Sequence, residues 1–231
     1  GLDGLAGSIA SVTLTILGVW FQIQGLDSLA ILSFTLLGGV LAFLAFNWHP
    51  AQIFMGDTGS LTLGFAMGSL VVAFMEYNFA LPEEAFMKIK PSFTFGIALM
   101  IYPLYDMARV FARRISKGQH PMTADKTHIH HFLIRMGYRH DQVAFVLGFL
   151  HLTLIILVFG LNNFSDNVVL PLLSFIVLFL GYRLDKVTVK YVKKKVMKSP
   201  KVLEIRPLTT ASLSKMRQDE KKTDPEELHL N

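Results

Sequence analysis

The chain has 231 residues, and its 22 lysines and arginines outnumber its 17 aspartates and glutamates, which gives a formal net charge of +5. Only 17% of the residues are charged and 52% are hydrophobic, whereas a soluble domain usually has about 25% charged residues, so the composition argues for a membrane protein. The absence of cysteine excludes disulfide scaffolds, thiolate metal sites and cysteine nucleophiles.

Six apolar segments are long enough, or nearly so, to cross a bilayer as helices of about 20 residues. Transmembrane strands would alternate polar and apolar residues, and these segments do not. The predicted spans are Leu5–Ile23, Leu29–Phe46, Leu61–Met75, Phe93–Val110, Val143–Leu161 and Val168–Tyr182. The sequence therefore predicts an all-α, polytopic membrane protein with about six transmembrane helices.

Lysine and arginine cluster in the loop after the fourth predicted span and in the C-terminal tail. By the positive-inside rule this side is expected to be cytoplasmic, together with the chain start and the loop after the second span. We divide the chain into a transmembrane region, 1–183, and a basic cytoplasmic tail, 184–231, which is expected to be partly disordered. Residues 187–198 are expected to lie against anionic lipids rather than to bind nucleic acid.

The first polar segment is GLDGLAG at residues 1–7, with Asp3 where the first predicted helix begins. Asp3 could simply cap that helix and complement its dipole. A charged residue at membrane depth is costly, which makes a functional role the alternative. Because the chain opens inside this motif and has no basic leader, we expect it to be the C-terminal part of a longer protein.

The second polar segment is residues 47–60, from Asn47 at the end of the second span to the start of the third. Asp57 lies there beside Gly56 and close to Gly59. Glycines at a helix N-terminus let phosphate oxygens approach backbone N–H groups, and a carboxylate there can hold Mg²⁺ together with substrate phosphates. The alternative is an aspartate that only caps the helix.

The third polar segment, residues 120–131, contains His128, His130 and His131. The spacing predicts that His128 and His131 share a helix face while His130 points elsewhere. Imidazoles can bind zinc, but the chain has neither an HExxH pattern nor cysteine. We therefore favour hydrogen bonding to a diphosphate, with a structural loop as the alternative.

Charged residues near the histidines extend the candidate site. Asp125 and Lys126 could bind substrate or form a solvated ion pair. Arg113 and Arg114 end the fourth predicted span, where topology alone explains them equally well.

Two ionisable residues fall inside predicted spans. Asp106 lies near membrane depth, where it is placed to pair with Arg109 or Arg113. His151 stands alone in the fifth span, and we interpret it as an interior histidine whose hydrogen bonds are satisfied.

Three segments match, in order and spacing, those of the polyprenyl-phosphate N-acetylhexosamine-1-phosphate transferases, which form glycosyltransferase family 4. They are GLDGLAG at 1–7, PAQIFMGDTGS at 50–60 and PMTADKTHIHH at 121–131. The chain resembles this membrane superfamily over residues 1–183. The DK–HIHH pattern is most similar to the branch that uses UDP-N-acetylglucosamine, which includes the bacterial enzymes that begin wall teichoic acid synthesis on undecaprenyl phosphate.

The resemblance implies a role for each matching residue. It makes Asp57 the ligand of Mg²⁺, which Mn²⁺ could replace, and puts Asp3 in the nucleotide- and active-site motif. It makes His128, His130 and His131 contacts of the sugar-nucleotide diphosphate. The implied substrate-binding residues are Asn47, Arg113, Arg114, Asp125 and Lys126.

The reaction implied by the resemblance joins N-acetylglucosamine 1-phosphate from UDP-N-acetylglucosamine to undecaprenyl phosphate and releases UMP. It would take place at the cytoplasmic face of a bacterial plasma membrane, in a monomer or a homodimer. The alternatives are the phospho-N-acetylmuramoyl-pentapeptide transferase of peptidoglycan synthesis and a non-catalytic membrane scaffold or transporter. The family's Asp–Asp pair, and its Asn before the GLDG segment, have no counterpart in these 231 residues, so we expect this portion to be inactive alone.

Overall fold

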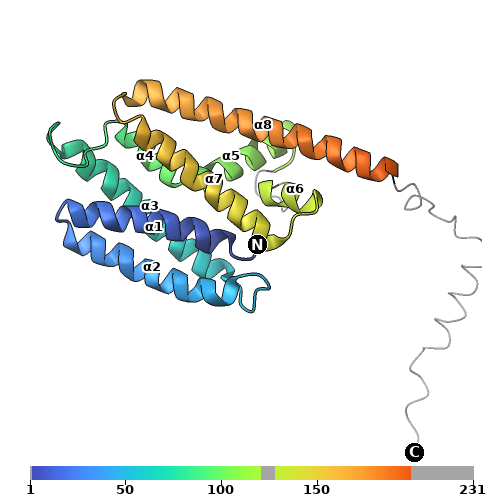
Figure 1. The fold of residues 1–231 in the computed structure, drawn as a ribbon, viewed down its shortest axis with the longest axis horizontal. Coiled ribbons are helices and arrows are strands. Elements are labelled where there is room, and N and C mark those ends of the chain that lie inside the picture. The colour runs from blue at the N-terminus through green and yellow to red at the C-terminus, as the bar shows by residue number, and fades with distance from the viewer. Residues whose placement is uncertain (1, 121–127, 199–231) are drawn as a thin grey trace, which may run out of the picture. The chain divides into compact units, whose positions relative to one another are not determined.

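The structure is a computed structural model that describes residues 2–120 and 128–198 (Figure 1). These residues form helices and no strands, which confirms the prediction of an all-α fold. The chain divides into two units, residues 1–190 and 191–231, and the helices described below belong to the first except where α8 runs on into the second.

The described residues contain eight helices. In chain order they are α1 (Leu5–Ile23), α2 (Asp27–Asn47), α3 (Gly56–Ala80), α4 (Ser92–Leu99), α5 (Ile101–Ser116), α6 (Ile129–Arg135), α7 (His140–Gly160) and α8 (Asp166–Lys198). Five of them, α1, α2, α3, α7 and the first part of α8, are long and apolar enough to cross a membrane, and α4 with α5 could make a sixth span. The expected polytopic architecture is therefore confirmed.

The fourth predicted span is a bent pair of helices rather than one straight helix. The chain turns by 77° between α4 and α5. The cause is Pro103, which has no N–H to donate to the carbonyl of Leu99 and whose ring would clash with that carbonyl in a continuous helix. The buried hydroxyl of Thr13 on α1 donates to the Leu99 carbonyl instead, at 2.7 Å. A neighbouring helix thus satisfies the polar group that the break exposes.

Thr13→Val should lower the free energy of unfolding by about 1–3 kcal/mol, because the buried Leu99 carbonyl would lose its donor. Thr15→Val is the matched control, since the Thr15 hydroxyl is exposed and donates within α1 to the carbonyl of Ser11. Reversible unfolding in mixed micelles measures both variants. Equal losses of stability would show that the Thr13 hydroxyl has no special part at the break.

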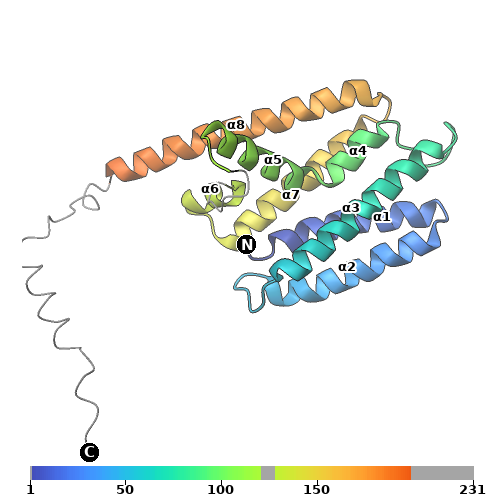
Figure 2. The same ribbon diagram turned by 180° about the vertical axis from the view of Figure 1, so that it is seen from behind.

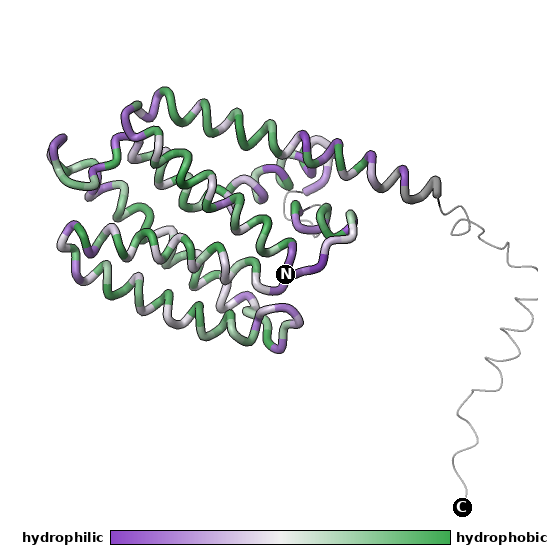
Figure 3. Tube along the Cα trace, in the orientation of Figure 1, coloured by the Kyte–Doolittle hydropathy of each residue, from purple (hydrophilic) through white to green (hydrophobic). Residues whose placement is uncertain are grey.

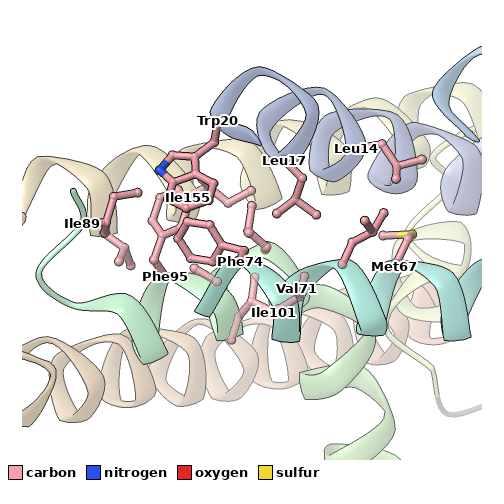
Figure 4. Close-up of a cluster of buried hydrophobic side chains, with 14 of the residues drawn as sticks. Leu14, Leu17, Trp20, Met67, Val71, Phe74, Ile89, Phe95, Ile101 and Ile155 are labelled. Carbon is pink, nitrogen blue, oxygen red and sulfur yellow. The ribbon is translucent and has the colours of Figure 1, made fainter. Parts of the chain in front are cut away.

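The core of the bundle lies where α1 packs against α2, α3 and α7. Figure 2 shows α3 lying across α1. Near one end the Trp20 ring meets Phe74 edge-on, with ring centroids 4.7 Å apart, and Phe95 of α4 packs on Phe74 (Figure 4). The Trp20 indole N–H donates to the carbonyl of Met87, which ties the loop after α3 to this core.

Hydrophobic residues run along most of each helix (Figure 3), and many large apolar side chains are exposed. Phe65, Phe79, Phe145 and Phe175 on α3, α7 and α8 are each more than 60% exposed. Such surface is unfavourable in water and favourable against lipid tails. The chain is accordingly a multi-pass membrane protein.

Three helices extend well beyond their predicted spans, and one of them is α5, which ends at Ser116 rather than at Val110. α3 begins at Gly56 rather than Leu61, and α8 continues past Tyr182 to Lys198. Hydropathy marks only the part of a helix that suits lipid, whereas intrahelical hydrogen bonds let the helix continue into polar surroundings. The extensions of α3 and α8 carry charged residues, Asp57 in α3 and Asp185 in α8.

Candidate active site

A cavity of about 570 Å³ lies among α1, α2, α3, α5 and the start of α6. Most of its wall is apolar. Its polar side chains come from four separate parts of the sequence: Asn47, Asp57, Ser60, Tyr102, Asp106, His128 and His130. The fold thus brings residues of the second and third polar segments to one cavity, together with Asp106 of α5.

Asp57 is the carboxylate of this cavity that is left free. It lies in the first turn of α3, where the helix dipole favours a negative charge, and its side chain is exposed. Gly56 precedes it with φ +65°, a conformation that glycine adopts readily. Within residues 2–120 and 128–198, no hydrogen bond reaches the Asp57 carboxylate.

Asp106 is the second carboxylate of the cavity, and each of its oxygens has a hydrogen-bond partner. Its Oδ2 lies 2.9 Å from Nδ1 of His128, and its Oδ1 accepts the backbone N–H of Ile129 at 2.9 Å. An ionised carboxylate can only accept a hydrogen bond, so Nδ1 of His128 carries the hydrogen. Nε2 is then the ring nitrogen that remains to contact a ligand. Asp106 is buried. Through these two contacts it holds both His128 and the first turn of α6 in place.

The prediction that His128 and His131 share a helix face, with His130 elsewhere, is wrong. His128 lies before α6 in an extended conformation, so helical spacing does not relate it to the residues that follow. His128 and His130 line the cavity and their rings stack with centroids 5.7 Å apart, whereas His131 does not line it. His131 packs instead on His130, at a centroid distance of 4.2 Å.

Burial, helped by the neighbouring His131, lowers the pKa of His130 from 6.5 to about 4. His130 is therefore neutral near pH 7. In that state it can donate one hydrogen bond to an anionic group but does not bring a positive charge.

Asn47 uses its side-chain amide to fasten the chain start to the loop after α2. Its Oδ1 accepts the backbone N–H of Gly4 at 3.0 Å, and its Nδ2 donates to the carbonyl of Ile53 at 2.7 Å. Gly4 has φ +74°, and a Cβ there would lie 3.0 Å from the Trp48 ring. Only glycine fits both the backbone conformation and this close approach.

The arginines at the end of α5 form a second polar group outside the cavity lining. Arg113 Nη2 lies 2.9 Å from Oδ2 of Asp185 on α8, and Arg109 Nη2 lies 3.5 Å from its Oδ1. Both guanidinium groups also lie over the Phe132 ring, at 5.5 and 4.8 Å from its centroid. Arg114 is buried. Asp185 did not stand out in the sequence, because only the fold brings it to these arginines.

Asp3 does not line the cavity either. Its Oδ2 lies 2.9 Å from Nδ1 of His49 and 3.1 Å from Nδ1 of His140. Burial raises the pKa of Asp3, but the two neighbouring histidines together outweigh burial, so the net pKa is below its usual value. Asp125 and Lys126 lie outside the described residues.

Comparisons with known proteins identify a family and several relatives. The sequence model of glycosyl transferase family 4 matches residues 1–75. The chain is 32% identical over 158 residues to decaprenyl-phosphate N-acetylglucosaminephosphotransferase of Mycolicibacterium smegmatis, which covers 64% of this chain and 39% of the relative. It is 31% identical over 185 residues to undecaprenyl-phosphate alpha-N-acetylglucosaminyl 1-phosphate transferase of Escherichia coli, which covers 78% of this chain and 47% of the relative.

A third relative, from Bacillus subtilis, is named a probable undecaprenyl-phosphate N-acetylglucosaminyl 1-phosphate transferase and is 34% identical over 153 residues, 65% of this chain and 40% of its own length. The chain belongs to glycosyl transferase family 4. It spans less than half the length of these relatives. No solved structure matches it.

Membership of glycosyl transferase family 4 rests on these relatives together with the family match, which covers the part of the chain that holds Asp3, Asn47 and Asp57 and ends at residue 75. The histidines lie beyond that match, so the place of His128 and His130 in one cavity with Asp57 rests on the fold. In this family member the cavity wall is completed by α5 and α6, which follow the matched segment in the chain.

The neutral state of His130 predicts how stability depends on pH. Between pH 6.5 and about 4 the unfolded chain takes up a proton at His130 that the folded protein does not, so stability falls as the pH falls. After a discount for partial exposure, His130→Gln should remove on the order of 2 kcal/mol of this pH dependence. His120→Gln, at an exposed histidine, is the control, and unfolding measured across this pH range checks the prediction. Identical pH profiles for the unchanged protein and His130→Gln would refute it.

Proposed function

We propose that the protein containing this chain transfers N-acetylglucosamine 1-phosphate from UDP-N-acetylglucosamine to undecaprenyl phosphate and releases UMP. An oxygen of the lipid phosphate would attack the β-phosphorus of the sugar nucleotide, and the bond from that phosphorus to the oxygen of UMP would break. The names of three relatives, all of which specify a polyprenyl phosphate and N-acetylglucosamine, support this reaction.

The observation that carries the proposal is the cavity that combines the free carboxylate of Asp57 with His128 and His130. Two anionic substrates can meet only where their charge is neutralised and their phosphates are held in line. A free carboxylate suits a hard cation, and imidazole N–H groups suit phosphate oxygens, so the cavity offers both kinds of group.

The residues fit Mg²⁺, which binds through one or two carboxylates and completes its shell with water and substrate phosphates. Asp57 would hold the ion, because both oxygens of Asp106 are already engaged. The chemistry that Mg²⁺, or Mn²⁺ in its place, would supply there is neutralisation of phosphate charge.

The chain's own groups would position the substrates. Asp106 would hold the His128 ring beside the diphosphate, and His130 would donate a hydrogen bond to one of its oxygens. Asn47 keeps the cavity wall in place through its two backbone contacts. Catalytic parts for Asp3 and His131, and substrate contacts for Arg113, Arg114, Asp125 and Lys126, stay predictions.

The cellular setting belongs to the same proposal. The cavity would open at the cytoplasmic face of a bacterial plasma membrane, where a polyprenyl phosphate presents its headgroup and UDP-sugars are dissolved. The product would begin a cell-wall polymer such as the teichoic acid linkage unit. A transporter would place its polar residues near the bilayer midplane, whereas here they gather near the ends of long apolar helices.

The test is a transfer assay with the full-length protein in detergent or nanodiscs. Radiolabel from UDP-N-acetylglucosamine should move to the lipid fraction, with one UMP released per label, only when undecaprenyl phosphate and Mg²⁺ are both present. UDP-N-acetylmuramoyl-pentapeptide serves as the competing donor. Transfer from that donor alone would replace this proposal by the pentapeptide transferase, and transfer from neither would exclude both.

A further inference from the structure

A second cluster of ligand-type side chains lies outside the cavity described above. Asp3 comes from the chain start, His49 from the loop after α2, and His140 is the first residue of α7. None of the three lines the 570 Å³ cavity. Their nearness in space joins segments that are far apart in the sequence.

The three donor atoms have the spacing of a metal centre. One carboxylate oxygen of Asp3 and one ring nitrogen each of His49 and His140 all lie within 4.8 Å of one another. Two of these separations are 2.9 and 3.1 Å. A tetrahedral ion with bonds of about 2.0–2.1 Å holds its ligand atoms about 3.3 Å apart, so only a small adjustment is needed to admit one.

One nitrogen of the cluster is left without a hydrogen bond. Nδ1 of His140 is buried and, among the residues that the structure describes, has no hydrogen-bond partner although it faces the Asp3 carboxylate. Nδ1 of His49 approaches the same carboxylate oxygen. Two imidazole nitrogens that converge on one carboxylate oxygen form the arrangement into which a cation fits.

We propose that Asp3, His49 and His140 bind a first-row transition-metal ion of the Zn²⁺ class. Two imidazole nitrogens with one carboxylate oxygen suit Zn²⁺ and its neighbours, whereas Mg²⁺ prefers oxygen ligands. Three protein ligands leave a fourth position for water. The backbone N–H of Ala51 hydrogen-bonds the Asp3 carboxylate, as outer-shell donors do at metal centres.

The ion would stabilise the arrangement of the segments that surround the cavity. It would fasten the chain start, the α2–α3 loop and the first turn of α7 to one another. The same chain start is tied through Gly4 N–H to Asn47, which lines the cavity. Binding to the folded state alone then raises stability by mass action. This proposal does not depend on the proposed function, because binding can be measured without substrate.

The probe is Co²⁺ added to the full-length protein after treatment with a chelator. We expect one Co²⁺ per chain with a visible d–d absorption band, retained in a millimolar excess of Mg²⁺, and displaced by Zn²⁺. We also expect the unfolding temperature to rise when either transition ion is added.

Asp3→Asn and His140→Gln should each weaken Co²⁺ binding by more than about 100-fold, beyond the loss typical of outer-shell residues. His120→Gln, which removes an imidazole elsewhere, and Asp57→Asn, which alters the proposed Mg²⁺ ligand, should leave Co²⁺ binding unchanged. Circular dichroism of the metal-free variants separates loss of the site from loss of the fold.

His140→Cys keeps the proposal testable if the other variants fold poorly. A thiolate is still a ligand, and these 231 residues contain no other cysteine. Co²⁺ should then give a near-ultraviolet thiolate-to-cobalt charge-transfer band that the unchanged protein lacks. Absence of that band in folded His140→Cys, or stoichiometric binding that survives Asp3→Asn and His140→Gln, would overturn the proposal.

Discussion

Asp57→Asn should reduce Mg²⁺-dependent transfer by the full-length protein at least about 100-fold, the scale of losing one electrostatic contact to the transition state. The substitution keeps the size of the side chain and its place in the first turn of α3 but removes the charge that would hold the ion. The measurement is the rate of transfer to undecaprenyl phosphate as Mg²⁺ is titrated.

Asp27→Asn is the matched control for this experiment. Asp27 is also an exposed aspartate in the first turn of a helix, α2, but it does not line the cavity. Its substitution changes the same charge and the same helix-dipole interaction, so its rate should stay close to that of the unchanged protein. An Asp57→Asn protein with an unaltered Mg²⁺ dependence would remove Asp57 from the proposed role.

Asp106→Asn should lower kcat by about 10- to 100-fold, by analogy with carboxylates that orient metal-bound histidines. The asparagine oxygen can still accept the N–H of Ile129, but its NH₂ group would face Nδ1 of His128. His128 would then lose the carboxylate that accepts its Nδ1–H and fixes the orientation of its ring. KM should change less than kcat, because the cavity keeps its shape.

Asp106→Ala separates the two tasks of this carboxylate. It also leaves the N–H of Ile129 without an acceptor, so it should cost about 1–3 kcal/mol of stability that Asp106→Asn does not. Asp141→Asn, at a carboxylate paired with the exposed Arg139, is the control. Steady-state kinetics of the three variants, together with their unfolding, give the comparison. A kcat for Asp106→Asn equal to that of the unchanged protein would show that the orientation of His128 is unimportant.

Much of the fold could be predicted because hydropathy in a membrane protein reports directly on the solvent of each segment. The α1 helix begins and ends at the predicted residues, and α7 extends only a few residues toward its N-terminus. The bend at Met100 was missed because the run from Phe93 to Val110 stays apolar across the break. The signal was present in Pro103, which a helix interior tolerates poorly.

The polar contacts were harder to predict because they join distant parts of the chain. Spacing along a helix could not place His130 in the cavity, since the helix starts only after His128. The contact between Arg113 and Asp185, and that between Asp3 and His140, depend on how α5, α7 and α8 pack. No local pattern in the sequence encodes such packing, whereas the motif around Asp57 signals its helix start by itself.

The contact of Asp106 with His128 and Ile129 has a consequence for biosynthesis. The ribosome synthesises α1, α2 and α3, with Asp57, well before it reaches the histidines. The nascent protein therefore passes through a stage in which the Asp57 carboxylate is present without the imidazoles of the cavity. Only when α6 emerges and docks on Asp106 does the imidazole side arrive. A partly synthesised chain would therefore present anionic groups without their counterparts, and the reaction centre would assemble as a late event of membrane insertion.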